Sequence, residues 1–274
     1  MRTAYLLGLF TGISAYDQRV EDPKSAPAAR RNLKLEILLV MALSLGQSAV
    51  YSLVSFADKA TRGPLGGQTT AMNTAKNTRE YFDLAYQLLE IGFALVPVLL
   101  ALYLMKRSTG TTVRMIGFDL RRPGRDSLAG LGLFLAMGIG TLGVYAAGRA
   151  LGITTALSTA NLGDYWWSIP VLLLSAARHA VVEEVIMLGV LFTYGRKLGA
   201  GAWKIIIISA AIRGSYHLYQ GIGPMIGNMI MGIVFGWVYH RFGRVMPLVI
   251  AHFLLDAFGF VGFLLLGPAI GIGA

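Results

Sequence analysis

The stretch WSIPVLLLSAARHAVVEEVIMLGVLF, residues 167–192, decides the fold class of this chain. An α-helix needs about 20 predominantly apolar residues to cross a bilayer, and this stretch is longer than that. It nevertheless contains four ionisable residues: Arg178, His179, Glu183 and Glu184. An ionisable side chain at bilayer depth is costly unless it is paired or hydrated. The stretch therefore predicts a membrane helix with one polar, functional face.

The composition of the whole chain indicates the same class. Of its 274 residues 55% are hydrophobic and only 14% are charged, against roughly 25% in a soluble domain. The absence of cysteine excludes a disulfide framework and any thiolate metal site. The net charge of +10 is not accompanied by a nucleic-acid recognition module, so we do not expect nucleic acid as a partner. The expected partner of the basic residues is the lipid bilayer.

Seven apolar stretches are predicted to span the membrane. They are Leu33–Phe56, Tyr81–Leu104, Leu128–Leu151, Trp167–Phe192, Trp203–Tyr219, Met225–Tyr239 and Met246–Leu266. An eighth, Ala4–Ala15, has about a dozen residues and suits the membrane surface better than a crossing. The predicted fold class is all-α, a polytopic membrane helix bundle with seven transmembrane helices, or eight if Ala4–Ala15 also crosses.

Basic residues predict the orientation of these spans. Seventeen Lys and Arg residues fall before the first span or in alternate loops, whereas the opposite side has four, all in the first loop. The positive-inside rule then places the N-terminus in the cytoplasm and the C-terminus outside the cell membrane. The first loop, Asp58–Glu80, is rich in Gly, Thr and Asn and is expected to be mobile.

Polar pairs with helical spacing occur in three of the predicted spans. Residues four apart on a helix share a face, and the pairs are His179 with Glu183, Arg213 with His217, and His252 with Asp256. One such pair in an apolar bundle is commonly a packing device, but three on separate helices predict a polar cavity between the fourth, fifth and seventh spans.

The residue types in this cavity favour general-base activation of water. The sequence has no His-Glu-x-x-His or His-x-x-Glu-His zinc motif, no Gly-x-Ser-x-Gly elbow and no Walker loop. Glutamate and histidine suit proton transfer, and the remaining His and Asp suit stabilisation of a developing oxyanion. We therefore expect neither a metal nor an organic cofactor, with zinc as a minor alternative.

The order Glu183-Glu184, then His217, then His252-x-x-x-Asp256 resembles the CPBP family. This family groups the type II CAAX prenyl endopeptidases with bacteriocin-processing and immunity proteins of the Abi type. The resemblance covers Ser168–Val261. It implies a five-helix catalytic core in residues 128–274, preceded by two membrane helices in 33–127 and a cytoplasmic or interfacial segment in 1–32.

Roles for the motif residues follow from the same resemblance. Glu183 would activate the attacking water together with His217, and Glu184 would orient the site. His252 and Asp256 would stabilise the oxyanion of the tetrahedral intermediate. The family is described mostly as glutamate-dependent and metal-free.

The chain departs from the family pattern at three positions. Leu188 stands where the family usually has arginine, Arg213 where it usually has phenylalanine, and Asp256 where it usually has asparagine. We expect Arg213 to supply the missing guanidinium by pairing with Glu184 from the neighbouring helix. An ionised Asp256 would oppose an oxyanion directly, but it could hold His252 as a charged donor.

The leading prediction is an intramembrane endopeptidase acting on a membrane-associated peptide or protein. His179, Arg213 and Asn228 are expected to support the site, while Tyr216, with Met187 and Phe253, is expected to give an apolar lining for substrate. The alternatives are an inactive immunity or scaffold relative, supported by Leu188 and Asp256, and a proton-coupled transporter using the buried Glu and His residues. No inverted repeat supports the transporter.

Overall fold

The computed structural model describes residues 27–158, 162–262 and 265, and most of these residues are helical. The predicted surface segment Ala4–Ala15, most of the segment 1–32 and the C-terminal end lie outside the described residues. In chain order the helices are α2 (Pro27–Leu43), α3 (Leu45–Arg62), α4 (Glu80–Ala94), α5 (Val96–Thr109), α6 (Pro123–Ala150), α7 (Ser168–Glu184), α8 (Leu191–Lys197), α9 (Ala202–His217), α10 (Ile222–Phe242) and α11 (Met246–Ala257).

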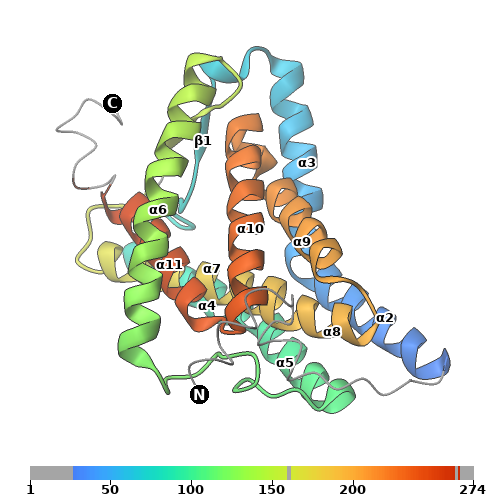
Figure 1. Ribbon diagram of the computed structural model, residues 1–274. Coiled ribbons are helices and arrows are strands. Elements are labelled where there is room, and N and C mark those ends of the chain that lie inside the picture. Colours follow the sequence, from blue (N-terminus) through green and yellow to red (C-terminus); the bar gives the residue numbers. More distant parts are fainter. Residues whose placement is uncertain (1–26, 159–161, 263–264, 266–274) are drawn as a thin grey trace.

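Shorter elements join these helices. A π-helical segment, Val185–Val190, links α7 to α8, and a second, Phe258–Gly262, follows α11. Single 3₁₀ turns occupy Leu65–Gly67 and Leu218–Gln220. The two strands, β1 (Thr69–Ala71) and β2 (Ala156–Ser158), pair in parallel with Thr69 opposite Ala156. Figure 1 shows α6 and α10 standing roughly parallel, with α7, α8 and α5 in the lower part of the molecule.

The all-α prediction is confirmed, whereas the count of seven spans is not. Three helical stretches of the described chain are long and apolar enough to cross a membrane: Glu80–Thr109, Pro123–Ala150 and Ile222–Phe242. The pair Pro27–Leu43 and Leu45–Arg62, bent by 49°, makes a fourth if it is one span. The other predicted spans contain α7, α9 and α11, which have 17, 16 and 12 residues, and α7 and α11 each continue directly into a π-helical segment. Length and composition alone therefore do not establish that these three segments cross the membrane.

The first two predicted spans are each broken near the middle. Between α2 and α3, the hydroxyl of Ser44 donates to the Val40 carbonyl at 2.6 Å, a bond back to the preceding turn that bends helices. Between α4 and α5, Pro97 lacks the N–H that would continue the ladder and its ring disturbs the preceding turn. Both breaks lie beside the cavity described below.

Close packing of α9 against α10 depends on glycine. A Cβ on Gly232 would lie 2.8 Å from the Ala210 Cα, and one on Gly236 would lie 3.2 Å from the Ile206 side chain. Small residues of this kind let two backbones approach, as in many membrane helix pairs. The contact places Arg213, near the end of α9, beside α10 and inside the core.

The first loop is folded rather than loosely connected. Its strand β1 pairs with β2, which follows α6, and Thr154 forms a further bridge with Gly221. Lys59 on α3 donates to the Tyr219 carbonyl at 2.6 Å, and Tyr219 N–H donates to the Ser52 hydroxyl at 2.8 Å. These long-range bonds hold parts of the polar loop against β2 and the turn after α9. They also fix the 3₁₀ turn that follows His217.

Candidate active site

One face of α7 lines a cavity of about 620 Å³. The residues on that face recur at intervals of three and four, the helical repeat: Ser175, Arg178, His179, Val182 and Glu183. The same cavity is lined by Tyr216 and His217 from the end of α9, and by His252 and Asp256 from α11. The predicted polar cavity between these three helices is therefore present.

Glu184 is the fully buried anchor of this cluster. Its Oε1 atom accepts from Arg213 Nη2 at 2.6 Å and lies 2.6 Å from His252 Nδ1. Its side chain has no exposed surface, and that of Arg213 has 1%. The carboxylate thus joins one residue from α9 and one from α11 to α7. The arrangement holds side chains from three helices together at one carboxylate.

Glu183, one residue earlier, faces the cavity. Its Oε2 atom accepts a hydrogen bond from the Tyr216 hydroxyl at 2.7 Å and lies 3.4 Å from Arg213 Nη1. His217 Nε2 lies 4.0 Å from the same oxygen. That separation is too long for a direct hydrogen bond. The two groups therefore face a common space at the cavity wall.

His252 lies between two carboxylates. Its Nδ1 contacts Glu184, and its Nε2 lies 3.6 Å from Asp256 Oδ2, one helical turn further along α11. The same Asp256 oxygen lies 3.7 Å from His179 Nδ1. The predicted pairs His179 with Glu183 and His252 with Asp256 thus belong to one continuous network of ionisable side chains.

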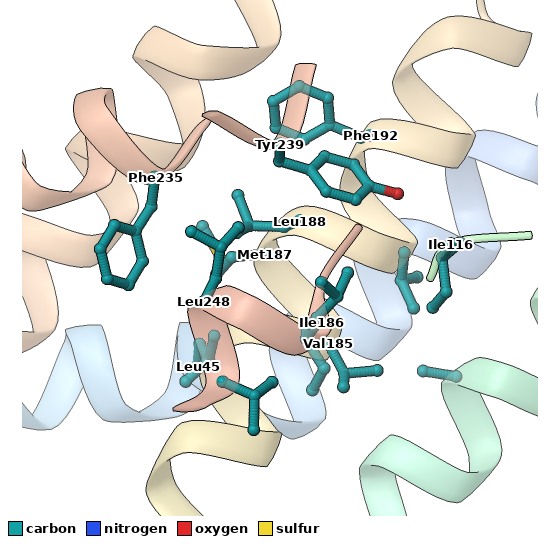
Figure 2. Packing of buried hydrophobic residues seen from close by; sticks show 14 of the residues in the cluster. Leu45, Ile116, Val185, Ile186, Met187, Leu188, Phe192, Phe235, Tyr239 and Leu248 are labelled. Atoms are coloured by element: carbon teal, nitrogen blue, oxygen red, sulfur yellow. The ribbon is translucent and has the colours of Figure 1, made fainter. Parts of the chain in front are cut away.

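The expected pairing of Arg213 with Glu184 from the neighbouring helix is present. Arg213 reaches from α9 to both glutamates of α7, with Nη2 on Glu184 and Nη1 nearer to Glu183. Leu188, at the family's arginine position, is 1% exposed and lies in the π-helical segment. Figure 2 shows it packed in the apolar core near Met187 and Leu248. The core thus keeps an apolar residue where the family has a charge.

A metal ion fits this cluster poorly. One ligand atom from each of Glu183, Glu184 and His252 lies within 4.8 Å of the others, a spacing that could hold an ion. However, the Arg213 guanidinium is 2.6 Å from Glu184 Oε1. A cation would have to bind beside this fixed positive charge and share its carboxylate oxygens.

Four supporting residues differ from expectation in their surroundings. Tyr216 presents its hydroxyl to Glu183, so its contribution is polar rather than apolar. Met187 has no exposed surface and belongs to the core, and Phe253 packs against core residues. Asn228 donates to the Pro224 carbonyl of its own helix at 3.0 Å and is not among the residues that line the cavity. An apolar pattern on a helix does not distinguish core from cavity lining.

The first half of the chain contributes a wall that the motifs did not reveal. The residues of this wall come from the α2–α3 break, from 71–76 after β1 and from α4, including Ser44, Asn73, Lys76, Gln87 and Glu90. Lys76 and Glu90 form an ion pair at 2.8 Å. Glu90, an acid inside an apolar stretch, was the available signal for this wall.

The segment that carries these residues matches a known protein family. Residues 165–258, about a third of the chain, match the family model described as type II CAAX prenyl endopeptidase Rce1-like. Searches of curated proteins and of solved structures gave no match. The matched segment contains every motif residue from Glu183 to Asp256 and supports a protease of the CAAX type in the membrane. The matched segment is thus similar to an Rce1-like domain of the type II CAAX prenyl endopeptidases, the family that the motifs of this chain resemble.

Proposed function

We propose that this protein is an intramembrane endopeptidase in which Glu183 and His217 activate the attacking water. The observation that carries the proposal is the 4.0 Å separation of Glu183 Oε2 and His217 Nε2 at the wall of the cavity. A water molecule about 2.8 Å from each atom would hydrogen-bond to both. Hydrolysis at membrane depth requires such a protected polar site.

The proposed reaction is general-base hydrolysis of a peptide bond. Glu183 removes a proton from the water while the water oxygen attacks the carbonyl carbon. The tetrahedral intermediate then collapses, the C–N bond breaks, and the proton passes from Glu183 to the leaving amine. Tyr216 and Arg213, which contact Glu183 Oε2, would hold the carboxylate in position for both transfers.

His252 is proposed as the donor to the oxyanion. Its Nδ1 is engaged with Glu184, so Nε2 is the atom that faces the cavity. Both ring nitrogens can donate hydrogen bonds at the same time only if the ring is an imidazolium. Carboxylates on both sides, Glu184 and Asp256, favour that charged form electrostatically. Asp256 would thus act through His252 rather than on the oxyanion itself.

The proposed substrate is a membrane-associated peptide or protein. Apolar helices surround the cavity, and the long apolar helices of the described chain are of membrane length. We also propose the orientation given by the positive-inside rule, with the N-terminus in the cytoplasm.

The test compares new protein termini in membranes of cells that express wild type, Glu183→Gln or Glu36→Gln at equal levels. Glu36 is a matched control because it bonds to Ser108 and Tyr194 away from this cavity. We expect a set of termini in wild type and Glu36→Gln that is lost in Glu183→Gln. These termini should persist when a metal chelator is added.

Two other outcomes would contradict parts of the proposal. Identical termini in all three strains, with the proteins folded, would overturn the protease function and favour the scaffold alternative. Termini that vanish with the chelator in wild type would overturn the metal-free mechanism and favour the zinc alternative.

A further inference from the structure

The imidazole of His217 is held by few contacts of its own. Neither of its ring nitrogens has a hydrogen-bond partner among the described residues, and Nε2 lies 4.0 Å from Glu183 Oε2. The Tyr216 ring lies beside the imidazole, with the two ring centroids 4.9 Å apart. The position of the imidazole relative to Glu183 therefore depends on the backbone at the end of α9, to which His217 belongs.

This backbone continues into the 3₁₀ turn Leu218–Gln220, and α3 holds that turn at Tyr219. The Tyr219 carbonyl accepts from Lys59 Nζ at 2.6 Å, and the Tyr219 N–H donates to the Ser52 hydroxyl at 2.8 Å. Ser52 and Lys59 stand about two helical turns apart, so they lie on the same face of α3. One face of one helix thus fixes both backbone groups of the second residue after His217.

The ammonium group of Lys59 also bonds to the residues that support the turn. Its Nζ donates to the Thr70 hydroxyl at 2.5 Å and lies 5.7 Å from the centre of the Tyr219 ring. The hydroxyl oxygens of Thr70 and Thr155 are 2.7 Å apart, and Thr155 donates its N–H and its hydroxyl to the Gln220 carbonyl at 3.1 and 3.0 Å. A hydrogen bond from an ionised donor is roughly twice as strong as a neutral one. Lys59 is thus the charged member of a network whose other bonds to the turn are neutral.

We propose that Lys59 is a positioning residue for His217: its bond to the Tyr219 carbonyl fixes the turn after α9, and thereby the distance between the imidazole and the water that Glu183 activates. The proposal rests on the proposed protease function and adds to it a residue from the first half of the chain. Lys59 lies outside the matched residues 165–258. The matched segment therefore depends on α3 for the placement of one of its own motif residues.

The experiment observes the His217 ring directly, by nuclear magnetic resonance of the full chain in detergent with its histidines isotopically labelled. The chain has only 4 histidines, so the variant His217→Gln identifies the signal of that ring. Lys59→Met removes the ammonium group and keeps a long, unbranched side chain. We expect the His217 signal to shift and broaden in Lys59→Met, while the signals of the other histidines stay in place.

The same variant should lower kcat without raising KM. The reporter is a synthetic peptide that carries one of the Glu183-dependent cleavage sites found in the comparison of termini. Misplacement of a reacting group by about 1 Å costs up to about a hundredfold in rate, so we expect kcat to fall about ten- to a hundredfold. Binding of the peptide should not change, because Lys59 is not among the residues that line the cavity.

Further variants separate positioning from a general effect on folding. Lys59→Arg keeps a charged donor and should retain the wild-type signal and most of the rate. Lys106→Met removes an exposed lysine of α5 that does not line the cavity, and it should change neither. Ser52→Ala removes the acceptor of the Tyr219 N–H with little change of shape, so it should also move the His217 signal, and it carries the test if Lys59→Met does not fold. Thermal unfolding of each variant checks that it is folded.

An unchanged His217 signal in both Lys59→Met and Ser52→Ala would overturn the inference. So would an equal shift in Lys106→Met, a shift that spreads to every histidine, or a rise in KM with kcat unchanged. The spectra need no substrate and are therefore independent of the comparison of termini. Glu183-dependent termini together with an unchanged His217 signal would mean that only the role of Lys59 is wrong, whereas a shifted signal without such termini would mean that the protease function is wrong.

Discussion

Arg213 is the single residue on which the charge balance of the site depends most. It is buried, and its two terminal nitrogens face Glu183 and Glu184 from the neighbouring helix. Without it, two adjacent carboxylates would be left in a region where unpaired charge is expensive. The pair with Glu184 was predictable because the missing arginine at Leu188 and the unexpected one at position 213 are complementary changes.

Replacing Arg213 by the family's phenylalanine should therefore destabilise the protein strongly. Removal of one partner of a buried ion pair costs about 3–5 kcal/mol, so we expect Arg213→Phe to lower the midpoint of thermal unfolding in detergent. The double variant Arg213→Phe/Leu188→Arg returns the guanidinium one turn from Glu184 on its own helix. It should be more stable than the single variant.

The comparison is informative in both directions. A double variant no more stable than Arg213→Phe would mean that the core around Leu188, with Met187 and Leu248, does not admit the larger side chain. The idea that the two positions are interchangeable would then be wrong.

At the scale of elements, the α9–α10 contact determines where the cavity residues stand. Arg213, Tyr216 and His217 all lie in the last two turns of α9, and Gly232 on α10 sets the distance between these helices. The helices themselves could be predicted from apolar stretches. This contact could not, since the chain has 34 glycines and their number does not indicate which face a neighbour.

Gly232→Ala should lower stability and move the site. The added methyl would lie 2.8 Å from the Ala210 Cα and 3.4 Å from the Arg213 Cδ. Overpacking of this kind costs about 1–3 kcal/mol. Gly140→Ala on α6 is the control, because nothing lies within 4 Å of its Cβ. It should leave the unfolding midpoint unchanged or raise it slightly, through the better helix propensity of alanine.

Unfolding midpoints and Glu183-dependent cleavage would be measured for both glycine variants. If Gly232→Ala matched Gly140→Ala in both, the close contact of α9 and α10 would not control the position of Arg213.

At the scale of the whole molecule, one ionic cluster links the α5–α6 loop and the first turn of α6 to the turn before α11. Arg244, in the turn between α10 and α11, donates to Asp126 at 3.0 and 2.6 Å and to Asp119 at 3.0 Å. Backbone bonds join the same segments, Val245 N–H to the Ile116 carbonyl and Met246 N–H to that of Gly117. The cluster connects the α5–α6 loop to α11, which carries His252.

This cluster predicts a pH dependence of stability. The hydrogen bond from Arg244 holds the pKa of Asp119 below its usual value. Stability from the ionised Asp119 is therefore complete above the unfolded-state pKa, about 4, and is lost as the pH falls through the lower pKa of the folded state. Asp119→Asn should lower the free energy of unfolding at pH 7 by about 1 kcal/mol or less, and should lower the unfolding midpoint accordingly.

The difference between wild type and Asp119→Asn should shrink as the pH is lowered below about 4, because the wild-type carboxyl becomes neutral as well. Midpoints measured from pH 7 to pH 3 check this. A difference that stays constant over that range would show that the charge of Asp119 is not what joins the loop to Arg244.

How much of this architecture is readable from the sequence depends on the range of the interactions. Helical spacing placed His179, Glu183, His252 and Asp256 on common faces because the helix repeat is local. The wall from the first half, including Asn73, was not predicted, since it depends on a three-residue strand pairing with residues more than 80 positions away. Short strands carry too few residues for a pattern.

The exchange of the guanidinium between helices also affects how such sequences are sorted. A search pattern that demands arginine at position 188 would reject this chain, although an arginine contacts Glu184 from position 213. The arginine stands 25 positions further along the chain than the pattern requires, but its guanidinium contacts the same carboxylate. Sequence patterns for this kind of site should therefore accept an arginine at either position 188 or position 213.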